Sequence, residues 1–336
     1  MERSETRRGG FQARARSLVR TGLLGVVAAG ASLLIGTTYE PLAGPADPVL
    51  AVQTPPPPVA DPAGFDMGWD LPNLRHERVD YWVERFTTVP EMREKFAGFL
   101  ERAGRWAPPI LERLEERGMP LDLIFLAMIE SGFNPAATSP ARAAGIWQFI
   151  APTGERYGLA IDRAVDERRD PVRATDAALD YLQDLHDRFG SWYLAAAAYN
   201  TGENRVGRIM REETGSERAR READYYRIWD RLPSETRDYV PLMIAAARIA
   251  KDPRAYGFQP ADLQPSEWDE VVVPPATPLI KIANSVGITV LELKELNPHF
   301  RIHRTPNDRD YAVRIPAGTY DRLAHLDQET GRAVSD

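Results

Sequence analysis

Residues 126–140, LAMIESGFNPAATSP, contain the end of an apolar run, then the carboxylate of Glu130, and then residues typical of a turn. Residues 121–129 are almost entirely apolar, which predicts a helix inside a core. Gly132 and the Asn-Pro pair that follows predict that the helix ends just after Glu130. Burial and the negative end of the helix dipole both disfavour the ionised form, so we expect a raised pKa for Glu130 and a carboxyl that donates a proton. This stretch alone leaves open the alternative of an exposed Glu130 at a helix C-terminus.

Helical periodicity surrounds this stretch from about residue 66 to residue 260, with no run of strand alternation. Residues 66–260 therefore predict an all-α domain. The pattern then changes: EVVVPPATP (270–278) and YAVRIP (311–316) predict two short strands, and two amphipathic helices lie between them. Residues 266–320 predict a small β-α-α-β module, followed by a tail at 321–336.

The N-terminal segment has the composition of an export signal. Its arginines precede a short apolar stretch at residues 21–36, TGLLGVVAAGASLLIG, which is short for a bilayer span. We expect residues 1–46 to be a cleaved export signal or an N-terminal membrane anchor, and both remain open. Residues 47–65 are rich in proline and predict an extended linker.

Composition excludes several classes of site. The net charge of −7 argues against a nucleic-acid binder. The chain has no cysteine, which removes disulfides, thiolate metal sites and a Cys-linked lipid anchor. The five histidines lack metal-binding spacing. His299 and His303 are four residues apart, but Pro298 and Phe300 predict a Pro-containing turn and hence a surface position for both histidines. We expect neither a metal nor a cofactor.

Three further fragments pair aromatic rings with amide or carboxyl groups. They are GIWQF with Trp147 and Gln148, AAAAYNTG with Tyr199 and Asn200, and ETRDYV with Glu235 and Tyr239. Taken singly, aromatic residues in such fragments are more often core residues than ligand contacts. Their fixed order along one chain, together with Glu130, points instead to a carbohydrate site.

The residues that carry a family resemblance are IESGFNPAATSPARAAGIWQFIAPTG (129–154), AAYNTGENRV (197–206) and LPSETRDYVP (232–241). In these the chain resembles the lytic murein transglycosylases with a soluble-lytic-transglycosylase (SLT) catalytic domain, most of all the membrane-bound type D group. The likeness covers about residues 65–258 and implies a lysozyme-like all-α fold. The module is similar to a lysin motif (LysM), although PPATPL (274–279) replaces the usual GDTL opening and residues 301–310 form a long charged loop.

The resemblance implies a single catalytic residue, Glu130, acting as general acid and then general base on the MurNAc–GlcNAc β-1,4 bond of peptidoglycan. The product would carry a 1,6-anhydro-MurNAc end. Trp147 would stack on substrate or support a cleft wall. The other implied substrate-binding residues are Ser139, Gln148, Tyr199, Asn200, Glu235 and Tyr239. Two residues depart from the family pattern. Ile150 stands where a Met is often found, which alters one expected substrate subsite, and Arg142 stands in place of a Gly at a position where type D relatives also vary.

Three other functions stay open, and one of them, a chitin-acting enzyme, would need no contacts to a stem peptide. A muramidase-type hydrolase on the same fold needs a second carboxylate to activate water, and Glu155, Glu203 and Glu235 are the candidates. A non-catalytic wall-binding scaffold would bind peptidoglycan without releasing products. In each case the partner is the glycan strand, and we expect an exported protein of the bacterial periplasm or cell envelope, with residues 21–36 as the candidate inner-membrane anchor.

Overall fold

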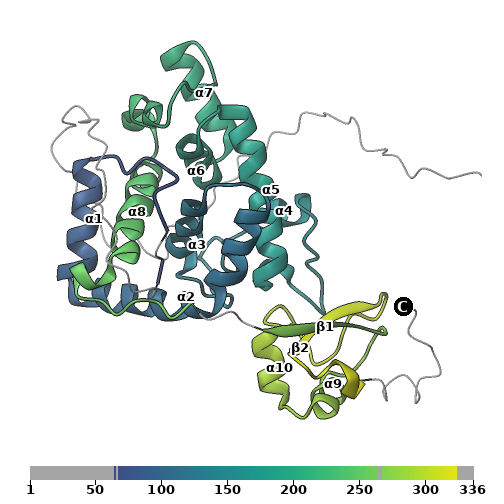
Figure 1. Ribbon diagram of the computed structural model, residues 1–336. Helices are drawn as coiled ribbons and strands as arrows, with labels where there is room; N and C mark the ends of the chain where they lie inside the picture. The colour runs from purple at the N-terminus through teal and green to yellow at the C-terminus, as the bar shows by residue number, and fades with distance from the viewer. Residues whose placement is uncertain (1–63, 66, 264–266, 324–336) are drawn as a thin grey trace, which may run out of the picture.

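The structure is a computed structural model that describes residues 64–65, 67–263 and 267–323. The predicted export signal or anchor, most of the predicted linker and residues 324–336 of the predicted tail lie outside these residues. Eight α-helices and five short 3₁₀ turns form the first part of the described chain (Figure 1). The α-helices are α1 (Glu77–Thr88), α2 (Pro90–Glu116), α3 (Ile124–Ser131), α4 (Ala151–Arg156), α5 (Pro171–Phe189), α6 (Trp192–Thr201), α7 (Glu203–Thr214) and α8 (Ser234–Lys251). The 3₁₀ turns are η2 (Leu121–Leu123), η3 (Glu167–Arg169), η4 (Glu222–Arg227), η5 (Trp229–Arg231) and η6 (Pro253–Tyr256).

Helix α3 is the centre of this part. Every residue from Ile124 to Glu130 is buried, and the helix packs against α2 and α8. A helix that is apolar on all sides is stable only inside a core, which is why this segment takes the central position. The sequence predicted one helix from residue 121, but its first turn is the 3₁₀ turn η2.

A left-handed glycine ends α3. Gly132 has φ of 59°, and its N–H donates to the carbonyl of Met128 over 2.7 Å. A Cβ atom at this position would lie 2.0 Å from the Phe99 ring, so only glycine fits. The helix therefore stops two residues after Glu130, as the sequence predicted.

Capping residues also fix the ends of the helices that bracket the site. The Ser191 hydroxyl caps α6 by accepting from the N–H of Leu194 over 3.2 Å. Gly190 and Gly202 stand at the C-caps of α5 and α6, and Gly190 is left-handed with φ of 67°. These short-range signals fix the C-terminal end of α6, where Tyr199 and Asn200 lie.

The second part is the β-α-α-β module. Strands β1 (Trp268–Val273) and β2 (Tyr311–Pro316) pair antiparallel, with Val271 opposite Val313. Helices α9 (Leu279–Val286) and α10 (Val290–Leu296) lie between the strands in sequence, and a 3₁₀ turn, η7 (Tyr320–Leu323), follows β2. The mainly α fold with a small β-α-α-β module is confirmed.

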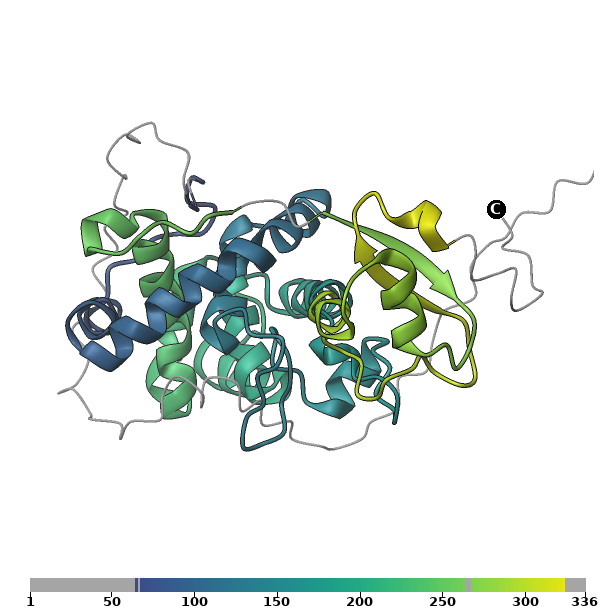
Figure 2. The same ribbon diagram turned by 90° about the horizontal axis from the view of Figure 1, so that it is seen from below.

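The module lies at one end of the helical part, and Figures 1 and 2 show it there from two sides. Its core of Leu279, Ile282, Leu293, Val313 and Ile315 also takes in residues of the helical part. Ala164 and Val165 pack into this same cluster. The prediction of a surface position for both histidines of the Pro-containing turn was wrong for His299, which is 1% exposed because the helical part covers it.

Candidate active site

Glu130 lies on the last turn of α3 with only 1% of its surface exposed. The Tyr239 hydroxyl donates to its Oε1 over 2.5 Å. Within the part of the chain that the structure describes, Oε2 has no hydrogen-bond partner. The alternative of an exposed Glu130 is therefore wrong.

Burial raises the pKa of Glu130 to about 8; the Tyr239 hydrogen bond opposes this rise and the negative charge of Glu235 adds to it. Placing a bare carboxylate in an apolar environment is costly, so the group keeps its proton at neutral pH. Unlike a surface glutamate, Glu130 is thus a proton donor under physiological conditions.

Two helices bring side chains towards Glu130 of α3. Helix α8 supplies Tyr239 and Glu235, and α6 supplies Tyr199 and Asn200; both helices pack together, and α8 also packs on α3. The pKa of Tyr199 is well above its ordinary value, first because it is buried and second because Glu130 is near. Tyr199 therefore remains a neutral hydroxyl beside the acid.

A tight turn carries Gln148. Its backbone is left-handed with φ of 49°, and its Nε2 donates to the carbonyl of Gly145 over 2.7 Å. Its buried Oε1 has no partner among the described residues. A Cβ at Gly145 would lie 1.7 Å from the Arg168 carbonyl oxygen, so glycine is required there. We call residues 144–149 the Gln148 turn.

Trp147 is fully buried, so of the two roles considered for it the structure favours support of the wall. Its Nε1 donates to the Thr175 hydroxyl of α5 over 2.9 Å. Its carbonyl accepts from the Tyr199 hydroxyl over 2.7 Å. The indole thus ties the Gln148 turn to α5, while its carbonyl ties the turn to α6.

Ser139 and Asn200 use their polar groups locally. The Ser139 hydroxyl accepts from the N–H of Ala143 over 3.1 Å, and Asn200 Oδ1 accepts from the Thr236 hydroxyl over 2.8 Å. Both side chains are buried. The contacts given for the described residues join Asn200 to α8 but do not link Ser139 to Glu130.

Glu235 is half-buried, and burial raises its pKa while the nearby Asn200 amide opposes the rise. Of the three candidate second carboxylates, it is the one whose charge acts on Glu130. Glu203 instead accepts from Tyr181 and pairs with Arg156, and Glu155 is exposed. Glu235 is thus the second acid of the site.

Sequence reasoning missed two supporting hydroxyls. The Ser131 hydroxyl donates to the carbonyl of Ile146 over 2.9 Å and accepts from the N–H of Asn134 over 3.1 Å, so it holds the end of α3 to the Gln148 turn. Thr236 holds Asn200 as described above. Ser131 directly follows Glu130, and Thr236 directly follows Glu235. This adjacency was the available signal in the sequence.

Two family models match the chain. The transglycosylase SLT domain matches residues 109–221, which contain Glu130, Ser139, Trp147, Gln148, Tyr199 and Asn200. The LysM-like domain of lytic transglycosylase MltD matches residues 267–330.

The chain is an SLT-domain protein with an MltD-type LysM-like domain.

Curated relatives of the SLT domain carry related names. "Membrane-bound lytic murein transglycosylase D" of Escherichia coli K12 is 40% identical over 190 residues, which are 56% of this chain and 41% of that protein. "Membrane-bound lytic murein transglycosylase C" of Haemophilus ducreyi is 26% identical over 170 residues, which are 46% of this chain and 43% of that protein. The chain thus spans less than half the length of either relative.

The described residues of this SLT-domain protein hold no group of three or more His, Asp or Glu side chains arranged to bind a metal ion. They also contain no helix long and apolar enough to cross a membrane.

Proposed function

We propose that the protein is a peptidoglycan lytic transglycosylase. It cleaves the β-1,4 bond between MurNAc and GlcNAc without water and leaves 1,6-anhydro-MurNAc ends. The observation that carries this proposal is Glu130: a buried carboxyl in the SLT domain, with a pKa of about 8, one oxygen held by Tyr239 and the other unpartnered. Such a group enters the reaction already protonated.

In the first step Glu130 donates its proton to the glycosidic oxygen, and the bond from that oxygen to C1 of MurNAc breaks. Positive charge then develops at C1, where the acetamido group of the substrate stabilises it. The Tyr239 hydroxyl, 2.5 Å from Oε1, stabilises the carboxylate that Glu130 becomes. Proton donation and charge stabilisation thus use different oxygens of one side chain.

In the second step the Glu130 carboxylate takes the proton of the MurNAc C6 hydroxyl, whose oxygen attacks C1 of the same sugar. The new C6–O–C1 bond closes the anhydro ring, and Glu130 recovers its proton for the next turnover. Because nucleophile and electrophile belong to one sugar, the step costs little translational entropy. One carboxyl therefore suffices, where ordinary glycosidases use two.

The groups around Glu130 have distinct roles in this proposal. Gln148 offers its free Oε1 to an amide N–H of the substrate, since that oxygen is buried and otherwise unpaired. Tyr199 presents a neutral hydroxyl near the acetamido group. Asn200, which Thr236 holds in place, and Ser139 are further proposed substrate-binding residues.

One observation favours a second candidate, a muramidase-type hydrolase. The half-buried Glu235 acts electrostatically on Glu130, and a second carboxylate is what a hydrolase needs to activate water. Burial also raises the pKa of Glu235, the direction that suits a general base. A reducing-end product is one water heavier than an anhydro product, so mass spectrometry separates the two.

The test is digestion of purified peptidoglycan sacculi by the wild type and by Glu130→Gln. We expect anhydro-muropeptides from the wild type, and at least a thousandfold slower release by the variant at unchanged fold, since no other group delivers the proton. Retention of a tenth of the wild-type rate by the variant would remove the assignment of Glu130. A product mass with one added water would replace the transglycosylase by the hydrolase.

The remaining assignments extend this proposal. Residues 66–260 form the catalytic domain, and residues 266–320 bind glycan strands as a LysM-like module. Residues 1–46 export the protein and leave it in the periplasm or anchored at the inner membrane, where its substrate is found. N-terminal sequencing of the mature protein distinguishes a cleaved signal from a retained anchor.

A further inference from the structure

The LysM-like module is joined to the helical domain by backbone pairing. The N–H of Asp166 donates to the carbonyl of His299 over 2.9 Å, and the N–H of Arg301 donates to the carbonyl of Ala164 over 2.8 Å. Val165 and Phe300 thus face each other as in a sheet. We call residues 164–170 the docking segment.

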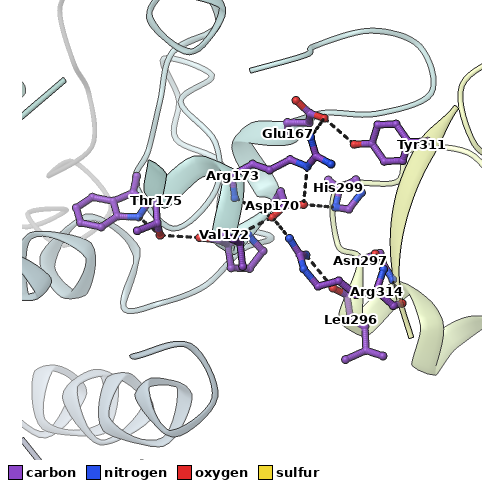
Figure 3. A network of polar contacts seen from close by, with 12 residues as sticks. Glu167, Asp170, Val172, Arg173, Thr175, Leu296, Asn297, His299, Tyr311 and Arg314 are labelled. Carbon is purple, nitrogen blue, oxygen red and sulfur yellow. Dashed lines mark hydrogen bonds and ion pairs between the residues drawn. The ribbon is translucent and has the colours of Figure 1, made fainter. Parts of the chain in front are cut away.

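A buried charge cluster lies beside this pairing (Figure 3). Asp170 is 0% exposed, and its two oxygens face Arg314 of β2 and His299 Nδ1, the latter 3.0 Å away. Asn297 fixes Arg314 in place by accepting from its N–H over 2.9 Å and donating to its carbonyl over 2.7 Å. Tyr311 adds a hydrogen bond to Glu167 over 2.7 Å. Losing one of these partners would leave a buried charge uncompensated, which is costly. The partners therefore hold the Asp170 carboxylate in place.

Asp170 is also the N-cap of α5. Its Oδ1 accepts from the N–H groups of Val172 and Arg173 over 3.0 and 3.1 Å. One turn further along α5, the Thr175 hydroxyl accepts from Trp147 Nε1. The module therefore contacts the N-terminal end of α5. The first turns of α5 in turn hold the Gln148 turn.

A second connection runs through Arg168 of the docking segment. Its guanidinium binds both Asp166 oxygens over 2.8 Å and donates to the carbonyl of Phe149 over 3.0 Å. Its own carbonyl oxygen lies against Gly145. The docking segment is thus packed against the module on one side and against the Gln148 turn on the other.

We propose that the docked LysM-like module is a structural part of the active site, and that Asp170 is the positioning residue through which it holds the Gln148 turn. The module then contributes to turnover even on substrates too short to reach it. Only the kinetic test of this role for the module depends on the proposed function. Its structural test needs no activity.

The kinetic test uses a soluble GlcNAc–MurNAc tetrasaccharide with stem peptides and the full chain. Arg314→Met removes the charge opposite Asp170, and we expect kcat to fall about tenfold with KM changed less than about twofold, as for a slightly misplaced site. The matched control is Arg309→Met, which breaks the exposed pair with Asp162 at the same interface and leaves kcat unchanged. Equal kcat for both variants would overturn the proposal.

A second variant guards against misfolding of Arg314→Met. Thr175→Val removes the acceptor for Trp147 without touching the module, and we expect a loss in kcat of similar size. Because both changes act on one path, the double variant should lose about as much as the larger single loss. Losses that multiply would show independent effects and reject the path.

The structural test is hydrogen exchange of the Gln148 turn. In Arg314→Met we expect faster exchange of the Ala144 and Gln148 amides, which are hydrogen-bonded within the turn, with α1 unchanged. Unchanged exchange at the turn overturns the proposal. If the wild type proves inactive on peptidoglycan, the proposed function fails while this measurement still decides whether docking holds the turn.

Discussion

Two fully buried carboxyl groups of this chain have opposite charge states. Among the described residues, Glu130 has a hydroxyl donor and no cationic partner, and burial raises its pKa to about 8. Asp170 is equally buried, and burial opposes its ionisation, yet the neighbouring His299 and Arg314 side chains bring its pKa far below the ordinary value. Burial sets the cost of a charge, and the partner decides whether that cost is offset. The contrast separates a proton donor from a structural anion.

The largest stability effect should come from removing a partner of the structural anion. We expect Arg314→Met to lower the free energy of unfolding by about 3 kcal/mol at pH 7, since it strands a buried charge. A group with a lowered folded pKa stabilises above its unfolded pKa and loses that contribution as pH falls. The difference between variant and wild type in urea unfolding should therefore shrink below about pH 4. A difference that is independent of pH would contradict the role of charge.

Removing the Glu130 carboxyl should change the free energy of unfolding in the opposite direction. A carboxyl whose folded pKa is raised destabilises the fold progressively as pH rises from 4.5 towards about 8, because the unfolded chain releases the proton more readily. Glu130→Gln removes that cost, so we expect it to be more stable than the wild type by about 3 kcal/mol at pH 7 and equally stable near pH 4. Urea unfolding at both pH values measures this. A less stable variant at pH 7 would mean that Glu130 is not kept protonated by burial.

The hydrogen bond from Tyr239 should tune the donor. Activity is expected to fall as pH rises through about 8, where Glu130 loses its proton. The Tyr239 hydroxyl lowers this pKa, so Tyr239→Phe should move the alkaline limb of kcat/KM upward by roughly one pH unit, as expected from losing one bond to a charged group. The pH profile on a soluble muropeptide provides the measurement, and an unmoved limb would assign the limb to another group.

The smallest effect should come from an exposed pair at the same interface as Asp170. Arg309 and Asp162 lie 2.7 Å apart with 36% and 39% of their side chains exposed. We expect Arg309→Met to change the free energy of unfolding by less than about 0.5 kcal/mol, since water and salt screen such pairs. A loss as large as that of Arg314→Met would remove burial as the reason for the difference.

The burial of Glu130 and its place at the end of α3 were predictable because their signals are local. An apolar run, a carboxylate and a glycine within a few residues predict both the helix and its end, and the chain order of the fragments predicts Tyr239 and Asn200. The anion cluster was not predictable, because Asp170 and Arg314 are 144 residues apart. Asp170 alone indicates only a helix cap, and Arg314 only a strand residue. His299 was placed at the surface because nothing near it in sequence shows what covers it.

Because α3 ends at Gly132, its length limits which sequence changes can keep the Glu130 carboxyl in position. Successive helix residues are rotated by about 100°, so an insertion or deletion of one residue between Ile124 and Glu130 would turn the carboxyl away from Tyr239 even with every neighbour intact. Length in this segment is thus as constrained as chemistry. Variation that conserves each side chain but changes the spacing should abolish turnover as completely as substituting the acid itself.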